Sequence, residues 1–195
     1  MKFYQEITIM PNNEIDKHFI LSKLFTQIHF GLVSIQDDQN KSPIGISFPE
    51  YFMGEKFGVL GSKLRLFAHN ESELIKFDAS KLMSRLSDYV HTSGISKVPE
   101  QINGYAAYNR YQPRKINKER LARRYAKRHK LDYETALKHY DDMKEEKIEL
   151  PFLNLKSLST GNEFCLWIKK TKIDQPSYQK FSTYGLSKIS TIPEF

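Results

Sequence analysis

Cysteine, long apolar runs and glycine-rich loops are scarce or missing in this 195-residue chain. The single cysteine, Cys165, excludes an internal disulfide and is typical of a reducing, cytoplasmic protein. No apolar run approaches the ~20 residues that a membrane-spanning helix needs. Residues 1–16 also lack the apolar stretch of a signal peptide. We therefore expect a cytoplasmic protein without a membrane partner.

Motifs for metal and nucleotide chemistry are missing as well. The sequence has no glycine-rich phosphate loop and no CxxC, HExxH or EF-hand spacing. Its acidic pairs, at 37–38 and 141–142, lie in very polar stretches that are typical of surfaces. We therefore expect no metal site and no cofactor. If the chain cuts a nucleic acid, metal-free chemistry is favoured, and this favours RNA, whose 2′-OH can attack the adjacent phosphate.

The chain does have an excess of positive charge, and that charge is unevenly placed. The net charge is +7. Residues 1–98 hold 11 Lys and Arg against 11 Asp and Glu, whereas residues 99–195 hold 19 against 12. The densest segment is KERLARRYAKRHK (118–130), where Glu119 is the single acidic residue. A neutral half joined to a half with one concentrated basic element is typical of proteins that bind a polyanion.

Residues 118–130 predict a helix with two different faces. Five basic residues share one stripe, and small or apolar residues, with His129, lie opposite. The basic stripe consists of Arg120, Arg123, Arg124, Lys127 and Arg128. A solvated helix surface usually mixes charge signs, and Arg suits bidentate contacts with phosphate and guanine. The pattern predicts a nucleic-acid-binding helix and leaves RNA and DNA open.

The periodicity of the remaining chain predicts an α+β fold with two domains. In residues 1–96 the expected order is β-α-β-β-α with a possible last strand, as in a ferredoxin-like domain. The expected elements are strands over 3–10, 43–49, 63–69 and 89–98, and helices over 15–33 and from 70 to about 86. Residues 97–195 are expected to form a smaller α+β domain that carries the arginine-rich helix. Its other elements are a helix over 132–147 and strands over 151–156 and 163–170.

Six histidines are candidate general bases, and one of them has a distinctive position. His29 lies near the end of the first expected helix, four residues after Phe25 on its apolar face. Its neighbours Ile28 and Phe30 could exclude water from the ring. The spacing alone leaves a structural role open, because most histidines pack or lie on the surface.

Several short stretches together resemble one family, the CRISPR-associated repeat-RNA endoribonucleases of the type I-F (Csy-type) system. The stretches occur in the family's order and span almost the whole chain. They are LFTQIHFGLV (24–33), IGISFP (44–49), NRYQ (109–112), ERLARRYAKRH (119–129), LPFLNLKSLSTGNEF (150–164) and YGLSKISTIPEF (184–195).

The resemblance implies a metal-independent endoribonuclease. It implies one cut in each repeat of a precursor CRISPR RNA, at the base of a hairpin, leaving a 2′,3′-cyclic phosphate and a 5′-hydroxyl. His29 would act on the 2′-OH, Ser157 would hold the ribose, and Tyr184 would help to orient the histidine. The implied partners are the CRISPR repeat RNA hairpin (crRNA), which is retained, and the other subunits of a type I-F guide-RNA surveillance complex.

The resemblance also implies a set of RNA contacts. Arg110 and Gln112 would hydrogen-bond bases near the hairpin foot, Phe164 would stack at the end of the stem, and Ser159 would lie near the scissile phosphate. Arg123, Arg124, Lys127, Arg128 and His129 match the helix that enters the major groove of the stem. Lys127 and Lys156 stand where the family often has Arg. Each therefore supplies the point charge of an ammonium group rather than the paired N–H donors of a guanidinium.

Two rival interpretations remain open. The chain could be a non-catalytic RNA hairpin-binding subunit in which His29 only packs, or a DNA-binding or assembly protein whose basic helix docks on duplex DNA. Each matched residue also has an ordinary structural reading when taken alone. Ser157 and Ser159, for example, could cap a turn before Gly161.

Overall fold

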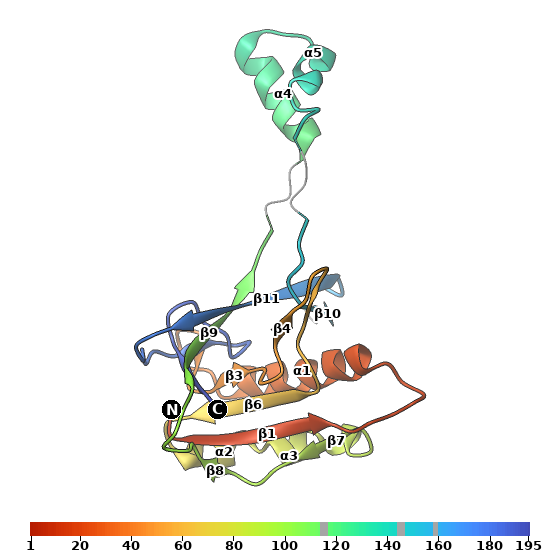
Figure 1. Ribbon diagram of the computed structural model, residues 1–195. Helices are drawn as coiled ribbons and strands as arrows, with labels where there is room; N and C mark the ends of the chain where they lie inside the picture. Colours follow the sequence, from red (N-terminus) through yellow and green to blue (C-terminus); the bar gives the residue numbers. More distant parts are fainter. Residues whose placement is uncertain (114–116, 144–146, 158–159) are drawn as a thin grey trace. The chain divides into compact units, whose positions relative to one another are not determined.

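The computed structural model describes residues 1–113, 117–143, 147–157 and 160–195 (Figure 1). The chain forms two compact units. Unit 1 consists of Met1–Tyr111 and Leu150–Phe195, and unit 2 consists of Gln112–Glu149. The arginine-rich segment therefore belongs to a unit inserted between two parts of unit 1.

The first sheet of unit 1 is antiparallel. Its strands β1 (Phe3–Ile9), β3 (Gly45–Ser47), β6 (Lys63–Ala68) and β7 (Val90–Thr92) follow the order β3-β6-β1-β7. The short strand β8 (Ser96–Lys97) also pairs with β1. Residues alternate in burial along β1, so that Ile7 and Ile9 face the core. The expected strands over 3–10 and 63–69 are confirmed, and 89–98 forms two short strands.

Helix α1 (Lys17–Ser34) begins at Asp16, whose carboxylate accepts hydrogen bonds from the backbone N–H groups of His18 and Phe19. Its apolar residues recur every three or four positions and are buried, which confirms the expected helix. They are Ile20, Leu21, Leu24, Phe25, Ile28 and Leu32. His29 lies next to this stripe in the last two turns.

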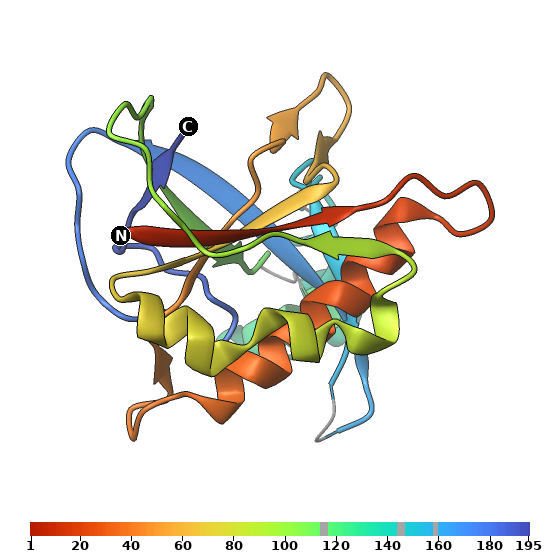
Figure 2. The same ribbon diagram turned by 90° about the horizontal axis from the view of Figure 1, so that it is seen from below.

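The prediction of a single helix from 70 to about 86 is wrong, because the helix is interrupted at Asp78. Helix α2 (Glu71–Phe77) ends there in the left-handed conformation (φ 49°), and α3 (Ala79–Leu82) and a short 3-10 turn (Ser84–Leu86) follow. Helix α2 begins with a capping box, in which the Glu73 carboxylate accepts from the backbone N–H of Asn70 at 3.0 Å. Figure 2 shows α2 and α3 crossing α1.

The second sheet of unit 1 combines the strands β10 (Phe152–Lys156), β11 (Glu163–Ile173), β9 (Gly104–Tyr111) and β13 (Ile192–Glu194), in that order. Neighbouring strands are antiparallel. The expected strands over 151–156 and 163–170 are confirmed. Strand β9 was not expected, although it carries the NRY of the NRYQ motif and lies at the centre of this sheet.

The two sheets share one hydrophobic core. Tyr108, Leu153, Leu166 and Ile168 from the second sheet belong to the same buried cluster as the residues of α1 and the first sheet. The expected boundary between residues 96 and 97 therefore falls inside unit 1, and the compact units differ from the expected 1–96 and 97–195 division. The structure is a mixed α/β fold in which most of the last 46 residues return to unit 1.

Two further strand pairs complete unit 1. Strand β2 (Lys41–Ser42) pairs with β12 (Phe181–Ser182), and β4 (Phe52–Met53) pairs with β5 (Gly58–Val59). The β2–β12 pair brings the loop after residue 182 beside β3, where the backbone N–H of Ile46 donates to the carbonyl of Gly185 at 2.9 Å. This pairing positions Thr183 and Tyr184 near α1.

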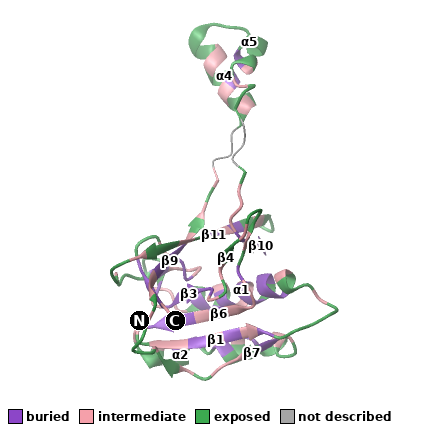
Figure 3. Cartoon of the chain, in the orientation of Figure 1, coloured by how far each residue is buried: buried purple, intermediate pink, exposed green. Residues whose placement is uncertain are grey.

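Unit 2 contains the helices α4 (Lys118–His129) and α5 (Tyr133–Lys138). The expected helix over 118–130 is confirmed, but the helix expected over 132–147 is wrong, because α5 ends at Lys138 and turns follow. Figure 3 shows mostly exposed residues in both helices, whereas buried residues line the sheets and α1 of unit 1. Among the described residues, no helix is both long and apolar enough to cross a membrane.

Candidate active site and candidate nucleic-acid interface

His29 is held by a backbone carbonyl from the far end of the chain. Its Nδ1 lies 2.8 Å from the carbonyl oxygen of Thr183. Because a carbonyl can only accept, Nδ1 must carry the hydrogen, and in a neutral imidazole Nε2 then keeps its lone pair. Within the described part of the chain, Nε2 has no hydrogen-bond partner. The half-buried ring therefore leaves the Nε2 lone pair available to accept a hydrogen bond or a proton.

Tyr184 fixes the plane of the same ring. The His29 and Tyr184 rings are parallel within 2°, and their centroids lie 4.2 Å apart. The Tyr184 ring is in turn stacked near the fully buried Phe25, at 6.4 Å. Stacked aromatic pairs contribute roughly 0.5–1.5 kcal/mol beyond the area they bury. The hydrogen bond and the stack together restrict the histidine to one tautomer and one orientation.

The loop that supplies Thr183 and Tyr184 depends on a left-handed glycine. Gly185 has φ +67°, and a Cβ added there would lie 2.4 Å from Cγ1 of Ile46. The Ser182 hydroxyl donates to the carbonyl of Leu186 at 2.8 Å, which closes the loop. The close approach to β3 thus requires glycine directly after the tyrosine.

Arg110 and Phe164 lie beside this pair. Arg110 is exposed near the end of β9, and its guanidinium carbon lies 5.5 Å from the Phe164 ring centroid and 6.0 Å from that of Tyr184. Phe164, on β11, is half-buried. A cation and an aromatic face, both open to a ligand, are therefore brought next to His29. The structure assembles four of the predicted site residues: His29, Tyr184, Arg110 and Phe164.

Ser157 lies in the turn that follows β10. Its hydroxyl accepts from the backbone N–H of Thr160 at 3.4 Å, and its carbonyl accepts from that of Gly161 at 2.8 Å. This is the turn-capping role that a strand-end serine ordinarily has. The preceding Lys156 is exposed at the end of β10, and Ser159 lies outside the described residues. The described contacts do not join Ser157 to the His29 group.

The basic helix α4 is capped at both ends. The Asn117 side chain accepts from the backbone N–H of Arg120 at 2.8 Å, and Lys130 ends the helix in the left-handed conformation. All five residues of the predicted basic stripe are exposed. An open groove of about 390 Å³ runs along the helix, lined by Asn117, Arg120, Arg123, Arg124 and Lys127.

The opposite side of α4 packs on α5 through aromatic rings. The Tyr125 ring lies 4.3 Å from that of His129 and 4.6 Å from that of His139, and Ala122 and Ala136 are fully buried. His129 therefore contacts its own unit rather than lying on the basic stripe. Gln112, which is exposed, also belongs to unit 2, whereas Arg110 of the same motif belongs to unit 1.

Sequence reasoning missed several residues that build the site. The carbonyl of Thr183, the support from Phe25 and the requirement for Gly185 depend on contacts between distant segments. The one available signal was the glycine after Tyr184, which is typical of a tight turn. Among the described residues, no group of three or more His, Cys, Asp or Glu side chains could hold a metal ion.

Comparison with known proteins gives matches over the whole chain. A family model described as CRISPR-associated protein (Cas_Csy4) matches residues 4–195. The CRISPR-associated endonuclease Cas6/Csy4 of Escherichia coli (strain UTI89 / UPEC) is 34% identical over 197 residues, which cover 100% of both chains. The protein of the same name from Pseudomonas aeruginosa (strain UCBPP-PA14) is 33% identical over 196 residues, again covering 100% of both.

Two solved structures also align with the chain at 10% identity. One, described as "An RAMP protein binding different RNA substrates", has a TM-score of 0.37 and covers 99% of both chains. The other, described as "CRISPR associated protein Cas6", has a TM-score of 0.33 and covers 99% of this chain and 98% of its own. The family model and the two relatives above 30% identity decide the family: this chain belongs to the Cas_Csy4 family of CRISPR-associated proteins.

Proposed function

We propose that this protein is an endoribonuclease that cuts precursor CRISPR RNA within each repeat, at the base of a stem-loop. The observation that carries the proposal is the geometry of His29. Its Nδ1–H is bound to a carbonyl, its ring is stacked on Tyr184, and its Nε2 is left for a substrate. The two relatives at 33% and 34% identity are both named CRISPR-associated endonucleases, which supports the same activity.

The proposed reaction is an attack of the RNA on itself. Nε2 of His29 takes the proton of the 2′-OH, the 2′ oxygen forms a bond to the adjacent phosphorus, and the bond from phosphorus to the 5′ oxygen breaks. The leaving 5′ oxygen takes up a proton, so the products are a 2′,3′-cyclic phosphate and a 5′-hydroxyl. The Thr183 carbonyl keeps its hydrogen bond from Nδ1–H, and the Tyr184 ring keeps the imidazole in place, while Nε2 takes up the proton. The scheme uses no metal and no cofactor.

The proposal assigns RNA contacts around this base. Phe164 stacks on the last base pair of the stem, and the adjacent Arg110 reads a base or binds a phosphate near it. Ser157 holds the ribose, while Lys156 supplies positive charge. Gln112 contacts a base near the hairpin foot, and Ser159 contacts the scissile phosphate.

The proposal assigns the hairpin stem to helix α4. Its exposed stripe of Arg120, Arg123, Arg124, Lys127 and Arg128 enters the major groove of the stem, with His129 at its end. An A-form major groove is normally too narrow for side chains, but a short stem that opens at its loop relieves this restriction. Many phosphate contacts favour retention of the hairpin product, which then stays in a guide-RNA complex with the other subunits.

The same proposal includes the finer features of fold and location. The order β7-β1-β6-β3, with α1 and α2 between the strands in sequence, supports a ferredoxin-like first part, and α4 belongs to a smaller inserted part. The exposed, unpaired Cys165 fits the reducing environment of the cytoplasm.

The test is incubation of the full chain with its cognate repeat RNA, with and without EDTA. We expect one cut per repeat in both conditions and a cyclic phosphate at the new 3′ end. His29→Ala should slow cleavage by about 10²–10⁴-fold while the affinity for the RNA changes little. His91→Ala is the matched control, because His91 is exposed on β7, away from these residues.

Three outcomes would contradict the proposal. Unchanged cleavage by His29→Ala would remove the assigned base. Tight binding of the hairpin without any cleavage by the native protein would indicate a non-catalytic RNA-binding subunit. Tighter binding of the equivalent DNA hairpin would indicate a DNA-binding protein.

A further inference from the structure

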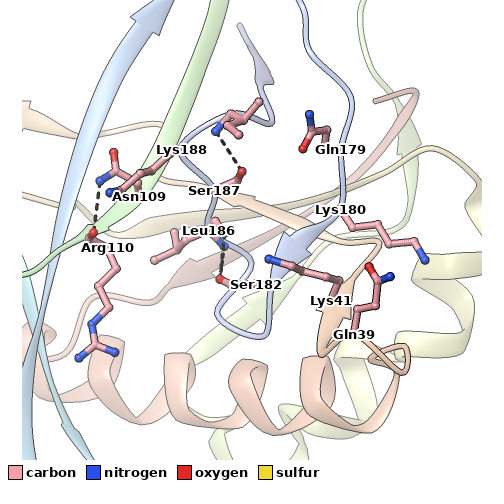
Figure 4. A pocket seen from close by; sticks show the side chains of 11 residues that line it. Gln39, Lys41, Asn109, Arg110, Gln179, Lys180, Ser182, Leu186, Ser187 and Lys188 are labelled. Carbon is pink, nitrogen blue, oxygen red and sulfur yellow. Dashed lines mark hydrogen bonds between the residues drawn. The ribbon is translucent and has the colours of Figure 1, made fainter.

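A second feature of unit 1 is a pocket of about 530 Å³ that shares Arg110 with the candidate active site. Figure 4 shows that its side chains come from three separate segments of the chain. Gln39 and Lys41 come from the turn before β2 and from β2 itself. Asn109 and Arg110 come from the end of β9, and the remaining lining residues come from 179–189.

The lining of the pocket is basic, and the described residues that form it include no carboxylate. Its cations are Lys41, Arg110, Lys180 and Lys188. Lys180 extends to Asp37, which its Nζ contacts at 2.7 Å. Within the described residues, Lys41, Lys188 and Arg110 have no acidic partner. Three uncompensated cations around one opening attract a polyanion more strongly than lysines that are spread among acids.

Amide side chains accompany these cations. Gln39 and Gln179 are exposed in the lining, and Asn109 donates only to the neighbouring carbonyl of Arg110, at 3.3 Å. Amides donate and accept hydrogen bonds, as the edges of unpaired bases require. The combination suits a ligand that alternates phosphates with base edges, and such a ligand is single-stranded nucleic acid.

Arg110 connects the pocket to the site of the cut. Its guanidinium lies near both Phe164 and Tyr184, and Tyr184 stacks on His29. In Figure 4 the Arg110 side chain points from β9 toward α1, and Arg110 is also part of the pocket lining. An RNA strand cut at His29 would therefore continue past Arg110 into this pocket.

We infer that this pocket binds the single-stranded RNA that continues from the cleavage site outside the hairpin. The inference rests on the proposed function and adds a second RNA-binding surface to it. The strand on the 5′ side and the strand on the 3′ side of the hairpin have the same chemistry, so the pocket recognises phosphates and bases of one of these flanks.

The test compares four RNAs, each with a 2′-deoxy nucleotide at the cut so that binding alone is measured. They are the hairpin alone, the hairpin with a 5′ extension, the hairpin with a 3′ extension, and the hairpin with both. Native protein should bind one of the singly extended RNAs about tenfold more tightly than the hairpin alone. The extension that produces the gain identifies the flank.

The double variant Lys41→Gln/Lys188→Gln should reduce that gain to less than about twofold and leave the affinity for the hairpin alone unchanged. For the extended RNA, the magnitude of the slope of log association constant against log salt concentration should fall by about 1.4. Each phosphate contact with a single strand contributes ~0.7, and the variant loses two lysines. The matched control is Lys76→Gln/Lys81→Gln, whose lysines are exposed on α2 and α3. Both substitutions in each pair are on the surface, so the thermal midpoint should not change.

The outcomes separate this inference from the proposed function. If neither extension improves binding, or if the double variant weakens all four RNAs equally, the pocket does not hold a flank. An equal loss in the control pair would likewise overturn the inference. If the RNA with both extensions and an unmodified 2′-OH at the cut is not cleaved at all, the proposed function fails instead.

Discussion

A histidine works as a general base when the protonation of its two ring nitrogens is decided by the protein rather than by solvent. In His29 the Thr183 carbonyl requires the hydrogen on Nδ1, and no side-chain substitution removes that carbonyl. The ring orientation depends on Tyr184, which can be replaced. At the scale of single residues, the tyrosine is therefore the informative position.

Two substitutions of Tyr184 distinguish the contribution of its ring to cleavage from that of its hydroxyl. Tyr184→Phe keeps the stack on His29 and should cleave within about threefold of the native rate. Tyr184→Ala removes the stack, and a catalytic group displaced by ~1 Å can lose about 10²-fold in rate. Single-turnover cleavage measures both rates. An equal loss in the two variants would show that the hydroxyl, not the stack, is what matters.

A substitution at Gly185 tests whether the loop must approach β3 closely. Gly185→Ala places a Cβ against Ile46 at a positive φ, so we expect a loss of about 1–2 kcal/mol in the free energy of unfolding. Cleavage should fall more than hairpin binding, because Thr183 and Tyr184 shift. Thermal unfolding and single-turnover rates measure the two effects. Gly94→Ala is the control, since a Cβ there meets no atom within 4 Å; an unchanged Gly185→Ala protein would contradict the argument.

At the scale of elements, α4 concentrates like charges that repel one another. Among the described residues, α4 has one ion pair, Arg123 with Glu119 at 3.5 Å, which joins two largely exposed side chains and contributes little. The helix is instead stabilised by its caps and by the packing of Tyr125 on α5. The cost of the repulsion is relieved when a polyanion binds.

Replacing arginines of the basic stripe should change the salt dependence of binding. Arg124→Ala and Arg128→Ala should each lower the slope of log K against log salt by about 1. Titration of the RNA hairpin at several salt concentrations measures this slope. Lys138→Ala, an exposed position on α5, is the matched control and should leave the slope unchanged. A slope that changes equally in all three variants would argue against a specific basic surface.

The ion pair between Glu6 on β1 and Arg65 on β6 should make the stability of the protein depend on pH. Burial tends to raise the pKa of Glu6, but the hydrogen bond and charge of Arg65, which it contacts at 2.7 Å, together with Lys63, lower the pKa below its ordinary value. The stabilisation is therefore present above the ordinary carboxyl pKa of about 4.3 and is lost as the pH falls through the lowered value.

Glu6→Gln should reduce the acid sensitivity that this carboxylate causes. The variant should be less stable than the native protein near neutral pH, and the difference should shrink as the pH falls below about 4. Denaturant unfolding across this range measures it. A constant difference at every pH would show that the carboxylate charge is not responsible.

At the scale of the whole molecule, unit 1 contains its own hydrophobic core. In the part of the chain that the structure describes, the residues of the buried cluster all come from 1–111 and 150–195. Among the described residues of unit 2, two alanines, Ala122 and Ala136, are buried, and Tyr125 is half-buried. If α4 binds the hairpin as proposed, RNA binding and fold stability depend largely on different parts of the chain.

Replacing residues 112–149 with a short Gly/Ser linker should leave unit 1 folded. We expect cooperative thermal unfolding to persist while affinity for the hairpin falls on the order of 10²-fold or more, because the phosphate contacts of α4 are lost. Circular dichroism and RNA titration measure the two properties. Loss of cooperative unfolding would show that unit 2 is needed for the core, and unchanged affinity would show that α4 is not the stem-binding element.

Elements with a regular period could be predicted from the sequence, and those that depend on distant partners could not. Helix α1 and helix α4 were expected because their apolar or basic positions repeat within one segment. The break at Asp78 was missed because the apolar pattern continues across it. Strand β9 was missed because its hydrogen bonds are made with β11 and β13, which lie far away in the sequence.

The sequence by itself determined the charged face of α4, the buried face of α1 and the motifs that indicated the family, because each is a local pattern of residues. The tertiary structure alone decided that the Thr183 carbonyl meets His29, 154 positions away, and so which ring nitrogen keeps its lone pair in the neutral imidazole. It also decided that residues 150–195 return to unit 1 and that Lys41, Arg110 and Lys188 surround one pocket. Such contacts result from how sheets and helices pack, and no local period encodes which distant segments will meet.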